Sequence, residues 1–197
     1  MPWAKTHNLH RDADAQSEIR NPKSAFMKIL GIDPGLERTG YGVVDAAAPD
    51  QRCAGGAHPQ LIEAGVIRTR REDALADRLV EIRDGLAAVL AEFAPDAVAV
   101  EALYAHYRHP RTAILMGHAR GVVYLAAAEA HAPVTSYNAT QIKKSLTGNG
   151  HAGKVQMQRA IQAAFSLSEP PAPADVADAL AVALCHEHHA VRVTQAP

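Results

Sequence analysis

The sequence predicts a single α/β domain, in which helices flank a mixed five-stranded sheet. Near the start of the predicted domain, short apolar segments are separated by turn residues, as in a series of strands. Farther along the chain, segments with helical periodicity alternate with segments that have the pattern of strands. Alternation of this kind is typical of helices packed on the faces of one sheet. The chain has 197 residues, of which 48% are hydrophobic and 21% charged. This composition and length suit one domain with a buried core.

The first 26 residues show neither periodicity, and we expect a disordered leader before a domain that spans 27–189. Three strands in a β-meander then open the domain, because each apolar segment ends at glycine, proline or polar residues. A polar stretch separates the second strand from the third. The predicted strands are 27–32, 40–44 and 61–68.

The rest of the chain is predicted to alternate helices and strands. From 72 to 93 apolar residues recur every three or four positions, which indicates an amphipathic helix, and Pro95 ends it. Asn138 and Gln141 have the spacing of a capping box at the start of another helix. Two further strands are predicted at 96–103 and 133–137. A second helix is predicted to follow the basic loop at 105–110 and to end at about 129, and further helices are predicted at 138–146, 154–165 and 175–189. A flexible tail is expected at 190–197.

Four acids lie in apolar surroundings. Asp33 and Glu101 end buried-type strands, and Asp175 and Asp178 lie on one face of a helix that is apolar all round. Each alone has an ordinary interpretation as a cap, a turn residue or a strand end. Together they would repel one another, and few basic residues adjoin them, so we expect hard divalent cations, Mg²⁺ or Mn²⁺. Two such ions on shared carboxylates suit phosphoryl hydrolysis.

The charge is unevenly distributed along the chain. Residues 102–168 contain seven Lys and Arg against one acid, Glu129, although the formal net charge of the whole chain is −1. A basic stretch of this length favours binding of a polyanion over a chance run of surface charge. An acidic metal site beside a basic surface therefore predicts a metal-dependent nuclease.

Five motifs, taken together, resemble the RuvC family of crossover junction endodeoxyribonucleases. They occur in the family's order and spacing between 27 and about 189. The resemblance implies a ribonuclease H-like fold and a homodimer that resolves four-way (Holliday) junctions by paired nicks during DNA recombination and repair, with the branch-migration proteins RuvA and RuvB as partners. The motifs are GIDPG at 31–35, TGYGV at 39–43, VE at 100–101, GHARG at 117–121 and ADVADALA at 174–181.

The resemblance also implies roles for individual residues. The four acids are expected to hold two Mg²⁺ ions, with Mn²⁺ able to substitute, and Asp33 is expected to bridge both ions. The aromatic ring of Tyr104, where the family commonly has phenylalanine, would stack on an unpaired base. A leader and an insert at 47–60 are further departures from the family, and none of the three touches the acids. The expected basic contacts to DNA are Lys154 and Lys143, near the scissile phosphate, and Lys144, Arg108 and Arg111.

Two other classes of protein stay open on the residues alone. An actin-like nucleotide-binding module shares the opening strand and glycine turn but needs a second phosphate loop, which the sequence does not offer. A non-catalytic DNA-binding subunit would keep the fold, and the four acids argue against it. The glycines at 35–40 have P-loop spacing, but Tyr41 and Gly42 stand where Lys and Ser or Thr are required.

Two further features leave a choice open. The helix at 113–128 carries Gly117, Ala119 and Gly121, and small residues of this kind permit close packing against a second subunit or against the core. The cluster at 185–189 contains three histidines but lacks the HExxH spacing. Histidines are favoured in the last turn of a helix, so a structural role is preferred to a metal site there.

The expected location is the cytoplasm. The two cysteines, Cys53 and Cys185, are too few and too far apart for a disulfide framework, which favours a reducing compartment. No uncharged apolar run reaches the roughly 18 residues that a membrane span needs. The sequence therefore predicts no membrane segment.

Overall fold

The structure, a computed structural model, describes residues 26–47, 58–103 and 110–194. Within these residues five strands form one mixed sheet in the order β3-β2-β1-β4-β5. The first three strands form the predicted antiparallel meander, and β4 and β5 extend the sheet parallel to β1. The strands are β1 (Phe26–Asp33), β2 (Arg38–Ala47), β3 (Gln60–Arg68), β4 (Ala97–Glu101) and β5 (Val134–Tyr137).

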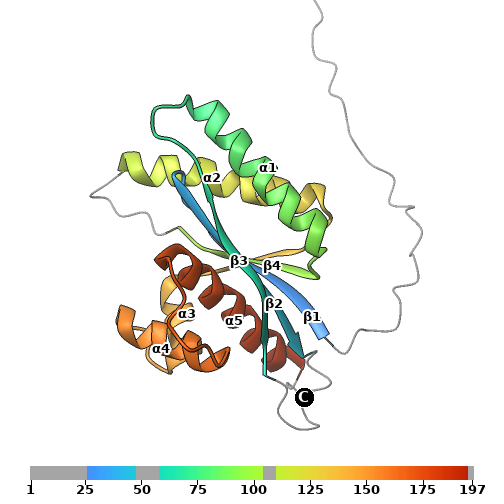
Figure 1. Cartoon of the computed structure of the whole chain (residues 1–197), viewed down its shortest axis with the longest axis vertical. Helices are drawn as coiled ribbons and strands as arrows, with labels where there is room; N and C mark the ends of the chain where they lie inside the picture. Colours follow the sequence, from blue (N-terminus) through green and yellow to red (C-terminus); the bar gives the residue numbers. More distant parts are fainter. Residues whose placement is uncertain (1–25, 48–57, 104–109, 195–197) are drawn as a thin grey trace, which may run out of the picture.

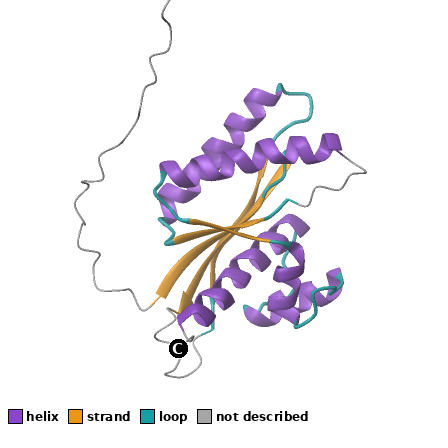
Figure 2. Cartoon of the chain, turned by 180° about the vertical axis from the view of Figure 1, so that it is seen from behind, coloured by secondary structure: helices purple, strands orange, loops and turns teal. Residues whose placement is uncertain are grey.

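Helices cover both faces of this sheet (Figure 1, Figure 2). One face carries α1 (Leu75–Phe93) and α2 (Pro110–Glu129), and the other carries α5 (Ala174–Thr194), with α3 (Ala139–Thr147) and α4 (Lys154–Ala164) outside it. The prediction of a mixed five-stranded sheet flanked by helices is confirmed.

Strand alternation divides the core between the two faces. Leu30 and Ile32 pack under α1 and α2, whereas Ile29 points to the opposite face, against α5. The side chains of β4 between Ala97 and Val100 are buried on both faces, as expected of a central parallel strand. The predicted all-round burial of the last helix is confirmed for residues 179–185 of α5, which are all buried, whereas Asp175 is half-buried and Asp178 is exposed at the start of the helix.

Two glycines let α5 approach the sheet unusually closely. A Cβ atom on Gly31 would lie against the carbonyl oxygen of Ala179 and 2.7 Å from the backbone nitrogen of Ala183. A Cβ atom on Gly40 would collide with the carbonyl oxygen of Asp175. Any side chain at these positions would force the helix away from β1 and β2, so the glycines set the depth at which α5 lies.

The structure corrects the predicted ends of two helices. The sequence ended the last helix at 189 and expected a flexible tail at 190–197, but α5 continues to Thr194, because no glycine or proline interrupts it. The expectation of a tail is therefore wrong for 190–194. Helix α1 starts at Leu75 rather than 72, because the guanidinium of Arg70 donates two 3.0 Å hydrogen bonds to the carboxylate of Asp73 and closes a turn first.

The predicted leader and most of the insert at 47–60 lie outside the described residues. No helix in the described part of the chain combines the length and apolar character needed to cross a bilayer.

Candidate active site

Asp33 and Glu101 lie next to each other at one edge of the sheet. Strands β1 and β4 are parallel, and Ile32 pairs with Val100. The next residue of each strand, Asp33 or Glu101, is also its last, so the two acids end neighbouring strands at the same level. Because side chains alternate along a strand, both acids point to the α5 face, opposite to Ile32 and Val100. The predicted convergence of these two acids is confirmed.

Helix α5 adds the other two acids from above that face. Asp175 and Asp178 lie in its first two turns, and the helix begins directly over β2, where Gly40 touches the backbone of Asp175. The four carboxyl groups influence one another electrostatically: Glu101, Asp178 and Asp175 all act on Asp33. The fold therefore brings together all four acids that the sequence singled out.

Burial and neighbouring charges raise the pKa values of Asp33, Glu101 and Asp178. Burial, followed by the charges of Glu101, Asp178 and Asp175, raises the pKa of Asp33 from 3.8 to about 7. Burial also raises the pKa of Glu101, and Asp178 raises it further. Desolvation is the main cause of the raised pKa of Asp178, with a further contribution from Asp175. The fully ionised cluster is therefore unfavourable without added positive charge.

Two lysines counter this repulsion. Lys143 on α3 lowers the pKa values of Glu101 and Asp178, although burial leaves both above their ordinary values. Lys154 acts on Asp178 in the same way. A capping box between Asn138 and Gln141, confirmed by 2.9 Å hydrogen bonds in both directions, starts α3 and so sets the position of Lys143. Both lysines thus lie close enough to the acids to act on their pKa values, and their expected contact with the scissile phosphate stays a prediction.

A third cation escaped the sequence reasoning. Arg38, the first residue of β2, places a guanidinium nitrogen 3.5 Å from a carboxylate oxygen of Asp175. The side chain of Arg38 is 56% exposed, so this is a surface ion pair of modest strength. Its position directly before Thr39, the first residue of the second motif, was the available signal, but Arg38 lies outside the basic stretch at 102–168 on which the sequence analysis concentrated.

The other predicted DNA contacts divide into two groups. Tyr104 and Arg108 lie outside the described residues. Arg111, near the start of α2, and Lys144 on α3 are exposed. Neither of these two residues contributes to the raised pKa values of Asp33, Glu101 and Asp178, whose causes among the described residues are burial and other charges.

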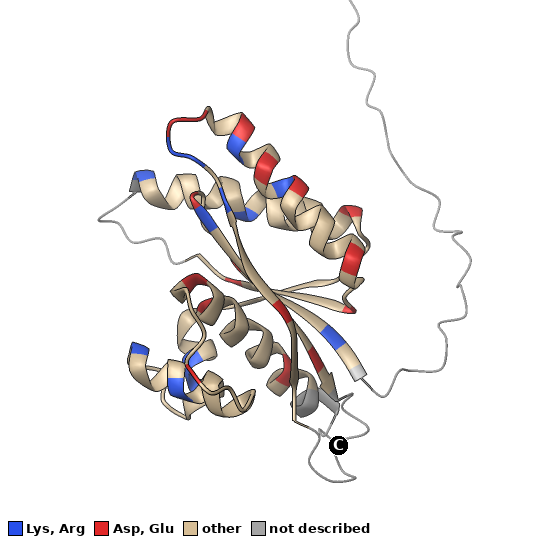
Figure 3. Cartoon of the chain, in the orientation of Figure 1, with Lys and Arg blue, Asp and Glu red and all other residues tan. Residues whose placement is uncertain are grey.

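In Figure 3, Lys and Arg residues occur along α3 and α4, on one side of the acidic start of α5, and at the start of α2, on the other side. The basic stretch is nevertheless not one continuous surface. Arg120 on α2 donates hydrogen bonds of 2.7 Å to the Tyr124 hydroxyl and 2.8 Å to Ser136, and its guanidinium packs over the Tyr124 ring. This arginine ties α2 to β5 instead of facing the acids.

The histidines at the end of the chain make packing contacts. His186 and the Tyr137 hydroxyl lie within 3.0 Å of each other, and the ring of His189 stacks on Tyr137 with 5.1 Å between centroids. A ring nitrogen of His188 lies 2.9 Å from the Ser145 hydroxyl. These contacts join α5 to β5 and α3, which favours the structural interpretation of the cluster.

The acidic cluster has the donor chemistry of a magnesium or manganese site. It offers carboxylate oxygens only, which are the ligands that hard divalent cations prefer. In the described part of the chain no three His, Cys, Asp or Glu side chains are arranged as ready ligands of one ion. Burial and neighbouring carboxylates nevertheless raise the pKa values of Asp33, Glu101 and Asp178, so a bound cation would relieve the repulsion between their ionised forms. The residues therefore fit a hard divalent cation.

The raised pKa of Asp33 predicts an unusual pH dependence of stability. Between pH 3.8 and about 7 the folded protein keeps a proton on Asp33 that the unfolded chain releases. Stability therefore falls as pH rises through this window, by at most about 1.4 kcal/mol per pH unit, and levels off above it. An asparagine at this position cannot titrate, so the contribution disappears in Asp33→Asn.

Urea unfolding of both proteins in EDTA, at pH values from 4 to 8, measures this contribution. The difference in unfolding free energy, wild type minus Asp33→Asn, should decrease steadily up to about pH 7, where the pKa of Asp33 lies. Titrating groups far from Asp33 cancel in this difference, so it reports on Asp33 and the acids coupled to it. A difference that is constant across the whole range would show that Asp33 titrates normally.

Comparison with known sequences connects this geometry to one family. The family model described as "Crossover junction endodeoxyribonuclease RuvC" matches residues 29–186. A crossover junction endodeoxyribonuclease RuvC of Rhodopirellula baltica is 54% identical over 157 residues, which cover 80% of this chain and 84% of the relative. The corresponding protein of Halorhodospira halophila is 43% identical over 162 residues, covering 82% and 90% of the two chains.

Solved structures agree with this match. Thermus thermophilus RuvC has a TM-score of 0.77 and 37% identity, and the alignment covers 85% of this chain and 98% of that one. The same protein has also been solved in complex with a Holliday junction substrate. The yeast mitochondrial Holliday junction resolvase Ydc2, with a TM-score of 0.60 and 14% identity over 88% of this chain and 83% of its own, supports the fold alone. The ribonuclease H-like fold expected from the sequence is thereby confirmed, and the chain belongs to the RuvC family of crossover junction endodeoxyribonucleases.

Proposed function

We propose that this protein resolves four-way DNA junctions by metal-dependent hydrolysis of phosphodiester bonds. The observation that carries the proposal is the convergence of four carboxyl groups from β1, β4 and α5 at one edge of the sheet, with lysines beside them. Membership of the RuvC family supports the junction as substrate, because a RuvC relative has been solved with a Holliday junction bound.

We assign the binding of the metal to Asp33, Glu101, Asp175 and Asp178, with Mg²⁺ as the expected ion and Mn²⁺ as a substitute. When bound, divalent ions supply activation of the attacking water and stabilisation of charge at the leaving 3′ oxygen. Asp33 must lose its proton before it can hold a cation, and its raised pKa puts this step near neutral pH.

The lysines have two tasks in this proposal. Lys143 and Lys154 favour the ionised forms of Glu101 and Asp178 before DNA arrives. Lys154 opens α4 directly after Gly153, on the exposed side of the acids, where its ammonium group can face the phosphate as negative charge develops. Tyr104, Arg108, Arg111 and Lys144 stay predicted contacts to the bases and phosphates flanking the cut.

The function is tested on a synthetic four-way junction and a linear duplex of the same sequence, with Mg²⁺, Mn²⁺ or EDTA. We expect paired nicks on the junction alone, visible on denaturing gels, with either metal and none in EDTA. Binding of the junction without nicks under either metal would favour the non-catalytic DNA-binding subunit instead. Equal cutting of junction and duplex would contradict the selectivity for junctions.

We further propose that two copies of the chain associate through the outer face of α2. On this face Ile114 and Leu125 are 63% and 54% exposed, and a Cβ atom on Gly121 would meet nothing within 4 Å. Gly117 and Gly121 both lie on the exposed side. Ala119, grouped with these glycines in the sequence analysis, is instead fully buried in the core of the subunit.

Sedimentation at micromolar concentration is expected to show a dimer that Leu125→Glu weakens. Burying a charge in place of a leucine should raise the dissociation constant at least about tenfold. Val80→Glu is the matched control, because Val80 is similarly exposed, at 51%, but lies on a different helix, α1. A monomer at micromolar concentration, or equal weakening by both changes, would contradict the proposed interface.

The remaining expectations concern partners and location. We propose RuvA and RuvB as partners because the chain belongs to the RuvC family. We keep the cytoplasm as the expected location, because the proposed substrate is the cell's recombining DNA.

A further inference from the structure

Arg78 on α1 is a buried arginine that binds neutral partners. It is only 8% exposed, and its guanidinium donates hydrogen bonds of 2.9 Å to the Thr69 hydroxyl oxygen and 3.1 Å to the carbonyl oxygen of Leu36. None of the ion pairs among the described residues includes Arg78. Burial of a guanidinium without a carboxylate partner costs free energy. A buried arginine that makes hydrogen bonds to neutral oxygens therefore suggests that these hydrogen bonds serve a purpose.

These hydrogen bonds meet at one turn. The Thr69 hydroxyl donates to the same Leu36 carbonyl at 2.6 Å, and the backbone N–H of Thr69 donates to the carbonyl of Glu37 at 3.0 Å. On the other side of the turn, the Thr39 hydroxyl donates to the carbonyl of Gly35 at 2.7 Å. Three consecutive carbonyl groups, from 35 to 37, are thus held from outside the turn.

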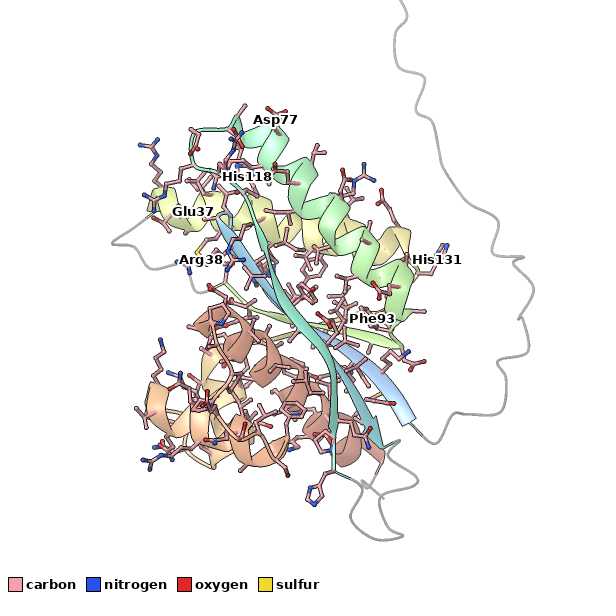
Figure 4. The ribbon with its side chains drawn as sticks, in the orientation of Figure 1. Glu37, Arg38, Asp77, Phe93, His118 and His131 are labelled. Atoms are coloured by element: carbon pink, nitrogen blue, oxygen red, sulfur yellow. The ribbon has the colours of Figure 1, made fainter. Side chains whose placement is uncertain are left out.

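The turn connects two residues of the active site. It follows Asp33, the last residue of β1, and ends at Arg38, whose guanidinium faces Asp175. Figure 4 shows Glu37 and Arg38 in this turn, between the start of α1, marked by Asp77, and the start of α5. Any shift of the turn would therefore move a carboxylate and a cation of the cluster together.

We propose that Arg78 is a positioning residue that holds the turn between Asp33 and Arg38. The inference rests on the proposed function, since it gives Asp33 a role in cleavage. The hydrogen bonds of Arg78 go to Thr69 and to the Leu36 carbonyl, and none goes to the acids, so its effect on cleavage passes through the backbone of the turn. A planar guanidinium can bind the Leu36 carbonyl and the Thr69 hydroxyl with fixed geometry, which the single ammonium group of a lysine cannot reproduce.

Junction cleavage by Arg78→Met is expected to show a kcat at least tenfold below that of the wild type, with KM and the dissociation constant for the junction within twofold. Arg78→Lys should recover part of the loss. Amide hydrogen exchange of the segment 34–39, measured at residues 35–39 because Pro34 has no N–H, should become faster in Arg78→Met. Thr69→Val removes the shared hydroxyl with little change of shape, and it should shift kcat and exchange in the same directions if Arg78→Met folds poorly.

Arg83→Met is the matched control, because Arg83 lies on the same helix in an exposed ion pair with Asp84. It should leave kcat and exchange unchanged. The proposal is overturned if Arg78→Met and Thr69→Val cleave like the wild type, or if exchange of 34–39 is unaffected. A wild-type protein that cuts no junction would refute the proposed function, and the exchange measurement would still decide whether Arg78 holds the turn.

Discussion

Asp33→Asn is expected to abolish junction cleavage while leaving junction binding intact. Asp33 is influenced by all three other acids, so it lies at the centre of the cluster that we expect to hold the metal. Loss of a supporting partner of a metal ligand typically costs 10- to 100-fold in activity, and loss of a central ligand should cost at least about 100-fold. Gel-shift binding in EDTA and initial cleavage rates in Mg²⁺ measure the two effects separately.

The same substitution should not destabilise the protein. Asparagine keeps the shape of aspartate and removes a charge that three neighbouring acids oppose, so the melting temperature at pH 8 in EDTA should stay equal or rise. Asp45→Asn is the matched control, because Asp45 pairs with Lys28 at the opposite end of the β1–β2 ladder. It should cleave like the wild type. Loss of binding together with cleavage in Asp33→Asn would mean that the acid maintains the fold.

Gly40→Ala is expected to be the most damaging small substitution in the site. The added methyl group would collide with the carbonyl oxygen of Asp175, in the first turn of α5. Either the helix start or β2 must move, which should cost about 1–3 kcal/mol of stability, as overpacked cores do. Because Asp175 and Asp178 move with the helix start, we expect cleavage to fall at least about tenfold, since small displacements of catalytic groups are costly.

Gly121→Ala provides the contrast for stability. Within the subunit its Cβ atom would meet nothing within 4 Å, and alanine is the better helix former by up to about 1 kcal/mol. Because Gly121 lies on the proposed dimer face, both glycine substitutions are compared in a Leu125→Glu background, in which that interface is weakened. Chemical unfolding should therefore show Gly121→Ala equal to or more stable than its Leu125→Glu parent and Gly40→Ala clearly less stable. If Gly40→Ala matched the wild type in stability and cleavage, the close approach of α5 to β2 would not exist in solution.

The sequence determined the local structure and the identity of the acids. Apolar periodicity is a local property, so it located the helices and strands within a few residues, and it showed that a helix with a buried middle section carries Asp175 and Asp178 near its start. Asp33 and Glu101 were conspicuous because each ends an apolar strand. The ends of elements were less certain: the Arg70–Asp73 turn delays α1, and nothing stops α5 at 189.

Tertiary structure alone decided which side chains meet. The ion pair of Arg38 with Asp175 and the hydrogen bonds of Arg78 with the 34–37 turn join residues that are far apart in the chain, and no local pattern encodes such contacts. Likewise Arg120 and Lys143 belong to one basic stretch, but the packing of their helices directs Arg120 to Ser136 on β5 and Lys143 to the acids. Residue types and periodicity thus identified the chemistry, whereas strand register and helix packing decided its geometry, because register and packing depend on contacts between distant parts of the chain.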